Sequence, residues 1–183
     1  MAVYISFSAE ISPKTIETLI AVLGEQANKR VQEVYLMLST PGGSVMHGFN
    51  LYNAMKAFPF NLITHNVGNV DSIGNIVFLA GKQRYACANS TFMFHGVGFD
   101  TAPGMRLEEK FLHERLDGIM QDQRRMGSVI KGHTKLDDGQ IQELFREART
   151  KDADFALGVG IVHEIRDVQI PAGEPVISLV FQR

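Results

Sequence analysis

The sequence predicts an α/β fold in which crossover helices connect the strands of a parallel sheet. In the first half of the chain, runs with strand character alternate with amphipathic helical segments, which is typical of parallel sheets. The run "VYLML" at residues 34–38 is almost entirely apolar, as expected for a strand covered on both faces. The 183 residues suffice for one domain with a sizeable core, so we expect a single domain over residues 1–183.

The first half of the chain carries three strand-like runs and the helices that connect them. Strands are expected at residues 3–8, 31–39 and 60–67, and helices at residues 12–30 and 45–58. The first helix has Ser12 as its cap and Pro13 in its first turn, which is a typical helix start. After the third strand, the chain is expected to pass into a helix at Asp71 and Ser72, and this helix ends at Gly81.

The second half is predicted to be richer in helix. Residues 83–88 and 91–97 are expected to form a strand pair around a turn. A long helix over residues 106–131 has an apolar stripe of Leu112, Leu116, Ile119 and Met120. The remaining expected elements are a helix over 136–148 capped at Asp137 or Asp138, a short helix near 152–158, and an alternating edge strand at 175–183.

Composition excludes several classes of function. The net charge is −2 without a block of one sign, so no nucleic-acid surface is expected. No stretch reaches the roughly 18 apolar residues of a membrane span. Cys87 is the single cysteine, which fits a reducing compartment, and a cytoplasmic protein is expected. The six histidines are scattered without metal-ligand spacing, so neither a metal nor another cofactor is expected.

Two features at predicted strand ends carry residues suited to catalysis. The turn "TPGGS" lets the backbone approach a ligand closely, and the following helix start offers N–H groups to an anion or oxyanion. An ordinary tight turn is the alternative, and no phosphate-loop lysine follows. Ser72 is either a helix cap or a nucleophile lifted out by the strand-to-helix turn. Asp71 is itself a good cap, which would leave Ser72 free for another role.

His95 ends the strand-like run "TFMFHG". Alternation puts Thr91, Met93 and His95 on one face, and Phe92 and Phe94 on the other. A histidine at such a position is either a core residue or, with a serine nucleophile at a neighbouring strand end, a general base.

These features together resemble the Clp protease proteolytic subunit (ClpP) family of serine peptidases. The family's "SPGGSV" is similar to "TPGGSV" at 40–45, and its "IYD-M" to "LYNAM" at 51–55. Its "G-AAS-MGA" is similar to "GNVDSIGN" at 68–75, with Ser72 on the nucleophile. Its "RY-LPNS-VMIHQP" resembles "RYACANSTFMFHGV" at 84–97, with His95 on the base, and its "SAEEA---GLIDEI" resembles "DADFALGVGIVHEI" at 152–165.

The resemblance implies a ClpP/crotonase-like ββα superhelix with a protruding handle helix. It implies Ser72 as nucleophile and His95 as general base, with the backbone N–H groups of Gly43 and Ile73 forming the oxyanion hole. The helix from about residue 106 would be the handle that joins two rings into a barrel-shaped homo-oligomer. Residues 166–183 extend beyond the matched region as a C-terminal extension, which would either cover the chain's own sheet or add to a neighbouring subunit's edge.

The third catalytic residue departs from the family pattern. Counting back from Ala153 puts the family's acid at Ala148, which has no carboxylate. Glu147 is adjacent and would reach His95 if the local backbone shifts. Asp152 and Asp154 are also near, though Asp152 looks like the cap of the following short helix. A substituted acid, a Ser-His dyad and an inactive homologue are therefore all open. Asp71 replaces a small family residue beside the nucleophile, where a carboxylate would favour a charged His95.

The resemblance implies a serine-type endopeptidase that cleaves peptides inside an oligomeric chamber. Expected partners are a peptide or protein substrate and further copies of the chain. The chain begins almost at its first strand, without the family's N-terminal axial loop, so coupling to an ATP-dependent unfoldase is left open. Two alternatives remain: a catalytically weak or inactive scaffold or regulatory subunit, and a crotonase-type acyl-CoA enzyme. The second shares the fold but accounts for neither Ser72 nor His95.

Overall fold

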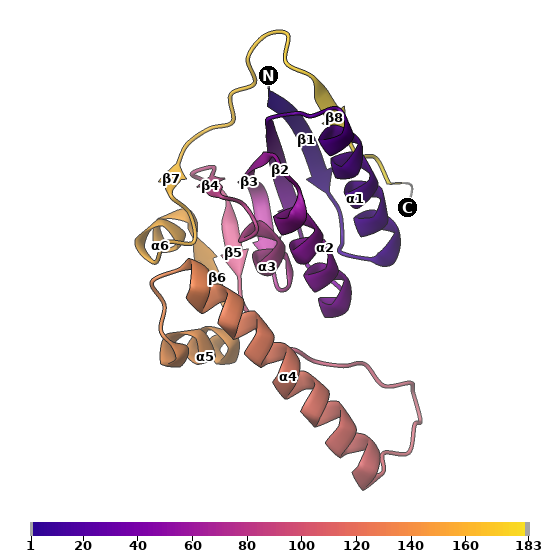
Figure 1. The fold of residues 1–183 in the computed structure, drawn as a ribbon. Coiled ribbons are helices and arrows are strands. Elements are labelled where there is room, and N and C mark those ends of the chain that lie inside the picture. The colour runs from indigo at the N-terminus through magenta and orange to yellow at the C-terminus, as the bar shows by residue number, and fades with distance from the viewer. Residues whose placement is uncertain (1, 182–183) are drawn as a thin grey trace.

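The structure, a computed structural model, describes residues 2–181 and is built around one eight-stranded sheet. The strands run β6-β5-β3-β2-β1-β8, and β4 and β7 join beside β3 (Figure 1). The strands are β1 (Ala2–Ser8), β2 (Glu33–Thr40), β3 (Asn61–Asp71), β4 (Gln83–Ala86), β5 (Thr91–Met93), β6 (Thr150–Asp152), β7 (Glu164–Ile165) and β8 (Val176–Ser178). The helices are α1 (Pro13–Asn28), α2 (Val45–Ala57), α3 (Gly74–Phe78), α4 (Glu109–His133), α5 (Asp138–Glu147) and α6 (Ala153–Gly158).

The strand pairs within the described residues are parallel except for β5 with β6, as the alternation of strands and helices predicts. The apolar faces of β1, β2, β3 and β5 share one core with α1, α2 and α3. Helix α1 begins as predicted, because the Ser12 side chain and Thr15 form a reciprocal capping box. Parallel strands bring their carboxyl ends to the same edge, so the turns that follow β2, β3 and β5 lie near one another.

The predicted strand pair of residues 83–88 with 91–97 is wrong. Strands β4 and β5 do not pair with each other; both pair in parallel with β3, β4 along Ile63–Asn66 and β5 along Asn69–Asp71. The reason is length, since β3 has 11 residues and accommodates both short strands on one edge. The Cys87 N–H bonds the Asn66 carbonyl, so the connecting turn continues along β3 instead of reversing.

Two segments lie at the periphery of the fold: α4 and the C-terminal segment that contains β8. Helix α4 projects away from the sheet, at the bottom of Figure 1. Its predicted apolar stripe is solvent-exposed, with Leu112, Leu116 and Met120 at 44%, 52% and 43% exposure. Strand β8 pairs with β1, so the C-terminal segment covers the chain's own sheet rather than a free edge elsewhere. No helix among residues 2–181 is long and apolar enough to cross a bilayer.

Candidate active site

The Gly-Gly turn after β2 packs directly against the end of β3. Gly42 has a φ of 89° and Gly43 a φ of 141°. A Cβ on Gly42 would lie 2.7 Å from the Cβ of Ser72 and 2.8 Å from the Asp71 carbonyl oxygen. Only glycine permits both this conformation and this approach. The structure therefore brings the predicted turn and the predicted nucleophile together.

Neither Asp71 nor Ser72 caps the following helix, contrary to the sequence prediction. Strand β3 continues through Asp71, which pairs with Met93 of β5, and α3 begins only at Gly74. The cap position is occupied by Ile73, which forms no side-chain capping bond. The Asp71 carboxylate instead accepts a hydrogen bond from Nδ2 of Asn69 at 2.6 Å. Pairing with β5 extends the strand, and this tertiary contact outweighs the local capping preference.

Ser72 occupies the short turn between β3 and α3 in a left-handed conformation, with a φ of 57°. This conformation is uncommon for a residue with a side chain, and such residues are concentrated at functional sites. Its N–H donates to the Met93 carbonyl at 2.8 Å, and its own carbonyl accepts from Nδ2 of Asn75 at 3.0 Å. The Ser72 hydroxyl forms no hydrogen bond within the described chain. The backbone is thus held on both sides while the hydroxyl is left free.

His95 follows β5, two residues after Met93. Phe92 and Phe94 are buried and His95 is half-buried, as the predicted alternation requires. The next residue is anchored to α5, because the Gly96 N–H donates to the Phe145 carbonyl at 3.1 Å. The His95 imidazole itself forms no hydrogen bond to any residue between 2 and 181. Ser72 and His95 therefore come from the ends of two neighbouring strands, and each has a free functional group.

Two backbone N–H groups beside Ser72 are unpaired. Gly43 is fixed by its neighbours, since the Ile11 N–H donates to the Gly42 carbonyl at 2.7 Å and the Ser44 N–H to the Ile11 carbonyl at 2.9 Å. The N–H groups of Gly43 and Ile73 donate to no acceptor in the part of the chain that the structure describes. Preset, unpaired donors of this kind stabilise a developing oxyanion.

No carboxylate in the described residues forms a hydrogen bond or ion pair with His95. The antiparallel pairing of β5 with β6 ends at Met93 and Thr150, and beyond it the Gly96 N–H donates to the Phe145 carbonyl, which does not continue that register. The position that the family pattern assigns to the acid is Ala148. Ala148 ends α5 in a left-handed conformation, with a φ of 50°. The neighbouring Glu147 accepts a hydrogen bond from Nζ of Lys151 at 2.8 Å, and this bond lowers the pKa of Glu147.

Asp152 and Asp154 are the other acidic residues that the sequence places nearby, and Asp152 already accepts a hydrogen bond from another group. Its Oδ1 accepts from the Phe155 N–H at 2.8 Å and caps α6, as predicted. None of these acidic side chains, Asp154 included, bonds His95 in the described part of the chain.

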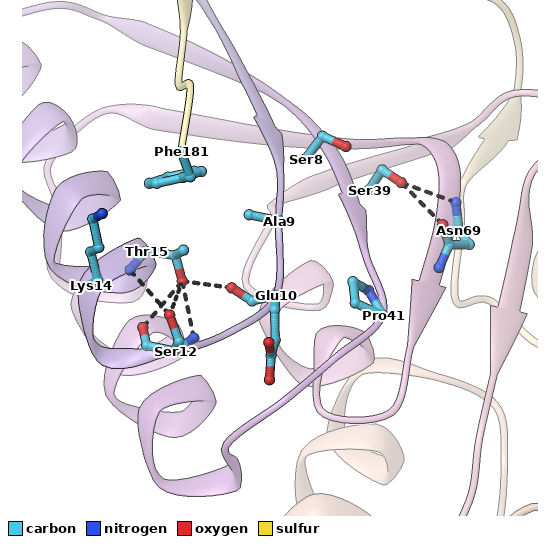
Figure 2. A pocket seen from close by; sticks show the side chains of 10 residues that line it. All are labelled: Ser8, Ala9, Glu10, Ser12, Lys14, Thr15, Ser39, Pro41, Asn69 and Phe181. Atoms are coloured by element: carbon cyan, nitrogen blue, oxygen red, sulfur yellow. Dashed lines mark hydrogen bonds between the residues drawn. The ribbon is translucent and has the colours of Figure 1, made fainter. Parts of the chain in front are cut away.

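A cleft of about 520 Å³ lies along the same edge of the sheet. Figure 2 shows Ser39 bonded to Asn69 on one side of it and the cap of α1 on the other, with Phe181 nearby. Pro41 of the Gly-Gly turn lines it, but neither Ser72 nor His95 does. The cleft is therefore next to the candidate catalytic residues rather than around them.

Sequence reasoning missed two asparagines of the site. Asn69 bonds the Asp71 carboxylate and also donates to the Thr40 carbonyl at 3.2 Å, which ties β2 to β3. Asn75 donates to the carbonyls of Ser72 and Met93, which ties the serine turn to β5. Both stand in "GNVDSIGN", but nothing in that string shows that their partners lie on other strands.

The protein is of the α/β class, because helices pack on a mostly parallel sheet. Its candidate catalytic residues lie at the carboxyl ends of the strands, where sheets of this kind commonly have their sites. The chain belongs to the Clp protease family, whose model matches residues 2–169. The family resemblance recognised in the sequence is thereby confirmed.

Similar proteins agree with the family assignment. "ATP-dependent Clp protease proteolytic subunit 1" of Leifsonia xyli subsp. xyli is 26% identical over 158 residues, covering 83% of this chain and 75% of the relative. "ATP-dependent Clp protease proteolytic subunit 2" of Corynebacterium diphtheriae is 28% identical over 169 residues, covering 88% and 79%.

Solved structures confirm the predicted fold. ClpP1 of Listeria monocytogenes matches with a TM-score of 0.76 and 20% identity, covering 91% of this chain and 92% of that one. A point mutant of the same Listeria protein matches with a TM-score of 0.79 and 19% identity over the same shares. At these identities the likeness establishes the ClpP-like fold alone.

Proposed function

We propose that the protein is a serine endopeptidase in which Ser72 attacks the peptide carbonyl and His95 accepts the serine proton. The observation that carries the proposal is the Ser72 turn, where a left-handed residue has a free hydroxyl and packs against the Gly-Gly turn. The N–H groups of Gly43 in that turn and of Ile73, the next residue, are unpaired in the described chain. A serine hydroxyl needs a base to become an effective nucleophile, and His95 follows the strand to which Ser72 is bonded. The N–H groups of Gly43 and Ile73 would hold the tetrahedral oxyanion.

The peptidase would act on peptides within an oligomeric chamber built from copies of this chain. The exposed apolar stripe of α4 supports this assembly, since it leaves Leu112, Leu116 and Met120 in water in a single copy. A cytoplasmic location is in keeping with the single, unpaired Cys87. An ATP-dependent unfoldase remains a further partner to test, because relatives carry "ATP-dependent" in their names.

A catalytically weak or inactive scaffold is the second candidate. The alanine at position 148 favours it, because the family pattern has its acid there and a carboxylate would orient the imidazole and stabilise its cation. The family assignment, by contrast, gives no support to the crotonase-type acyl-CoA enzyme.

Labelling with a fluorophosphonate, read by mass spectrometry of the intact protein, separates the two candidates. We expect one adduct on the wild type and none on Ser72→Ala, with hydrolysis of a fluorogenic peptide lost in the variant, by about a thousandfold or more. The native mass of both proteins controls for assembly. A wild type that forms an oligomer but takes no adduct would favour the scaffold.

A further inference from the structure

Asn75 is buried beside Ser72 without belonging to the proposed catalytic groups. It lies in α3 and its side chain is 1% exposed. Its Nδ2 donates to the Ser72 carbonyl at 3.0 Å and to the Met93 carbonyl at 2.8 Å. The same Met93 carbonyl accepts the Ser72 N–H at 2.8 Å. One amide group therefore joins the serine turn to the strand that leads to His95.

The amide oxygen of Asn75 shows that this arrangement is unfavourable on its own. Its Oδ1 is buried and has no hydrogen-bond partner among the described residues. An unpaired buried acceptor is destabilising, and such groups in a native structure call for an explanation. A small apolar side chain, such as the alanine that ends the family's "S-MGA" segment, would avoid the penalty. The two bonds donated by Nδ2 are what this chain gains from asparagine.

The backbone at Ser72 needs such a restraint. A residue with a side chain at a φ of 57° stays there only when its surroundings hold it. The cap position of α3 is held by Ile73, which supplies no capping side chain. Asn75 is accordingly the side chain that fixes the turn from within the core.

We propose that Asn75 is a positioning residue that sets the placement of Ser72 relative to His95. This inference rests on the proposed function, in which these two residues react together. Misplacing reacting groups by about 1 Å can slow a reaction on the order of 100-fold. Asn75 acts through the Ser72 carbonyl and through Met93, so its loss should slow the reaction step without weakening binding.

Asn66 offers a matched control on the same pair of strands. It is fully buried, and its Nδ2 donates to the Thr91 carbonyl at 2.8 Å, which also ties β3 to β5. Its Oδ1 accepts from the Gly68 N–H at 3.0 Å. Asn66→Ala thus removes a comparable cross-strand bond that does not touch Ser72.

The test compares Asn75→Ala, Asn66→Ala and the wild type by their rates of fluorophosphonate labelling, at a temperature where all three are folded. For Asn75→Ala we expect the maximal labelling rate to fall about 10- to 100-fold while the half-saturating probe concentration changes less than about twofold. Asn66→Ala should label within about threefold of the wild type. Wild-type labelling by Asn75→Ala, or equal slowing in both variants, would overturn the inference.

Amide hydrogen exchange resolved to Ser72 gives a readout that does not depend on activity. We expect the Ser72 N–H to exchange faster in Asn75→Ala than in Asn66→Ala, because Asn75 holds the turn that carries it. A wild type that cannot be labelled would sink the proposed function, and the exchange result alone would then decide the inference. Faster exchange in Asn75→Ala supports the restraint, and equal exchange in the two variants overturns it.

Discussion

The Ser72 turn and the His95 segment are held in very different ways. Ser72 is fixed by its own N–H, by Asn75 and by the close approach of Gly42. The His95 imidazole has no hydrogen-bond partner in residues 2–181, and the position of the family's acid holds Ala148. One half of the candidate site is thus rigidly built, while the other lacks the group that would orient it.

This difference shows which half of the candidate site is complete within a single copy of the chain. The serine side is assembled from strand ends that meet in the core, so it forms as soon as the sheet does. The histidine side lies next to the segment that leads to the projecting helix α4, where an apolar stripe is still exposed. We expect substitutions on the serine side to reduce stability and activity, and a suitable substitution on the histidine side to raise activity.

Among substitutions that keep the proposed catalytic side chains, the largest effect should come from Gly42→Ala on the rigid side. The new Cβ would lie 2.7 Å from that of Ser72, at a φ of 89° that alanine disfavours. We expect a loss of about 3 kcal/mol or more in the free energy of unfolding and labelling at least about 100-fold slower. Gly104→Ala is the control, since Gly104 has a φ of 75° but nothing within 4 Å of a Cβ. Equal effects of the two variants would contradict close packing at Ser72.

A second effect concerns pH and a different histidine. His65 is fully buried and hydrogen-bonded to the Tyr35 hydroxyl at 2.5 Å, and burial lowers its pKa to about 4. The unfolded chain, in which the pKa is about 6.5, binds the proton first. Stability is therefore complete above about pH 6.5 and falls toward pH 4, by about 2–3 kcal/mol at pH 4.5.

Denaturant unfolding at pH 7 and pH 4.5 measures this loss. His65→Gln should be less stable at pH 7 but should show a smaller decrease between the two pH values. The comparison matters for His95, because a fall in activity with acid would otherwise be assigned to the proposed base alone. An unchanged decrease in His65→Gln would show that another group causes it.

The smallest expected effect is a gain on the open side. Ala148→Asp puts a carboxylate at the position of the family's acid, where it would orient the His95 imidazole, and we expect peptide hydrolysis to rise about tenfold. Glu147→Gln serves as the control and should change the rate less than about twofold, since the Glu147 carboxylate is paired with Lys151. A rate unchanged by Ala148→Asp, with a drop in Glu147→Gln, would make Glu147 the acid after all.

Local signals predicted the elements of this fold well. Ser12 caps α1 as expected, Asp137 caps α5, and the buried strand "VYLML" lies in the middle of the sheet. The family motifs supplied the fold, which the structural comparisons confirm. The catalytic roles remain predictions, although the structure places the four residues at the carboxyl ends of neighbouring strands: Ser72, His95, Gly43 and Ile73.

The errors arose where a distant partner decides the local structure. The predicted pairing of residues 83–88 with 91–97 was wrong because β3 is long enough to pair with β4 and β5 in succession. The length of β3 in turn depends on those partners. The prediction of a helix cap at Asp71 was wrong for the same reason, because pairing with Met93 keeps Asp71 in the strand. The asparagines at 69 and 75 could not be recognised, since their role lies entirely in bonds to other strands.

The pairing of β8 with β1 joins segments from opposite ends of the described chain. During synthesis, β1 emerges from the ribosome long before Val176–Ser178 exist, so one edge of the nascent sheet stays unpaired for most of translation. That edge is a template for pairing with another nascent chain. The C-terminal segment therefore closes this edge of the sheet late in biogenesis, and until then the edge can pair with another chain.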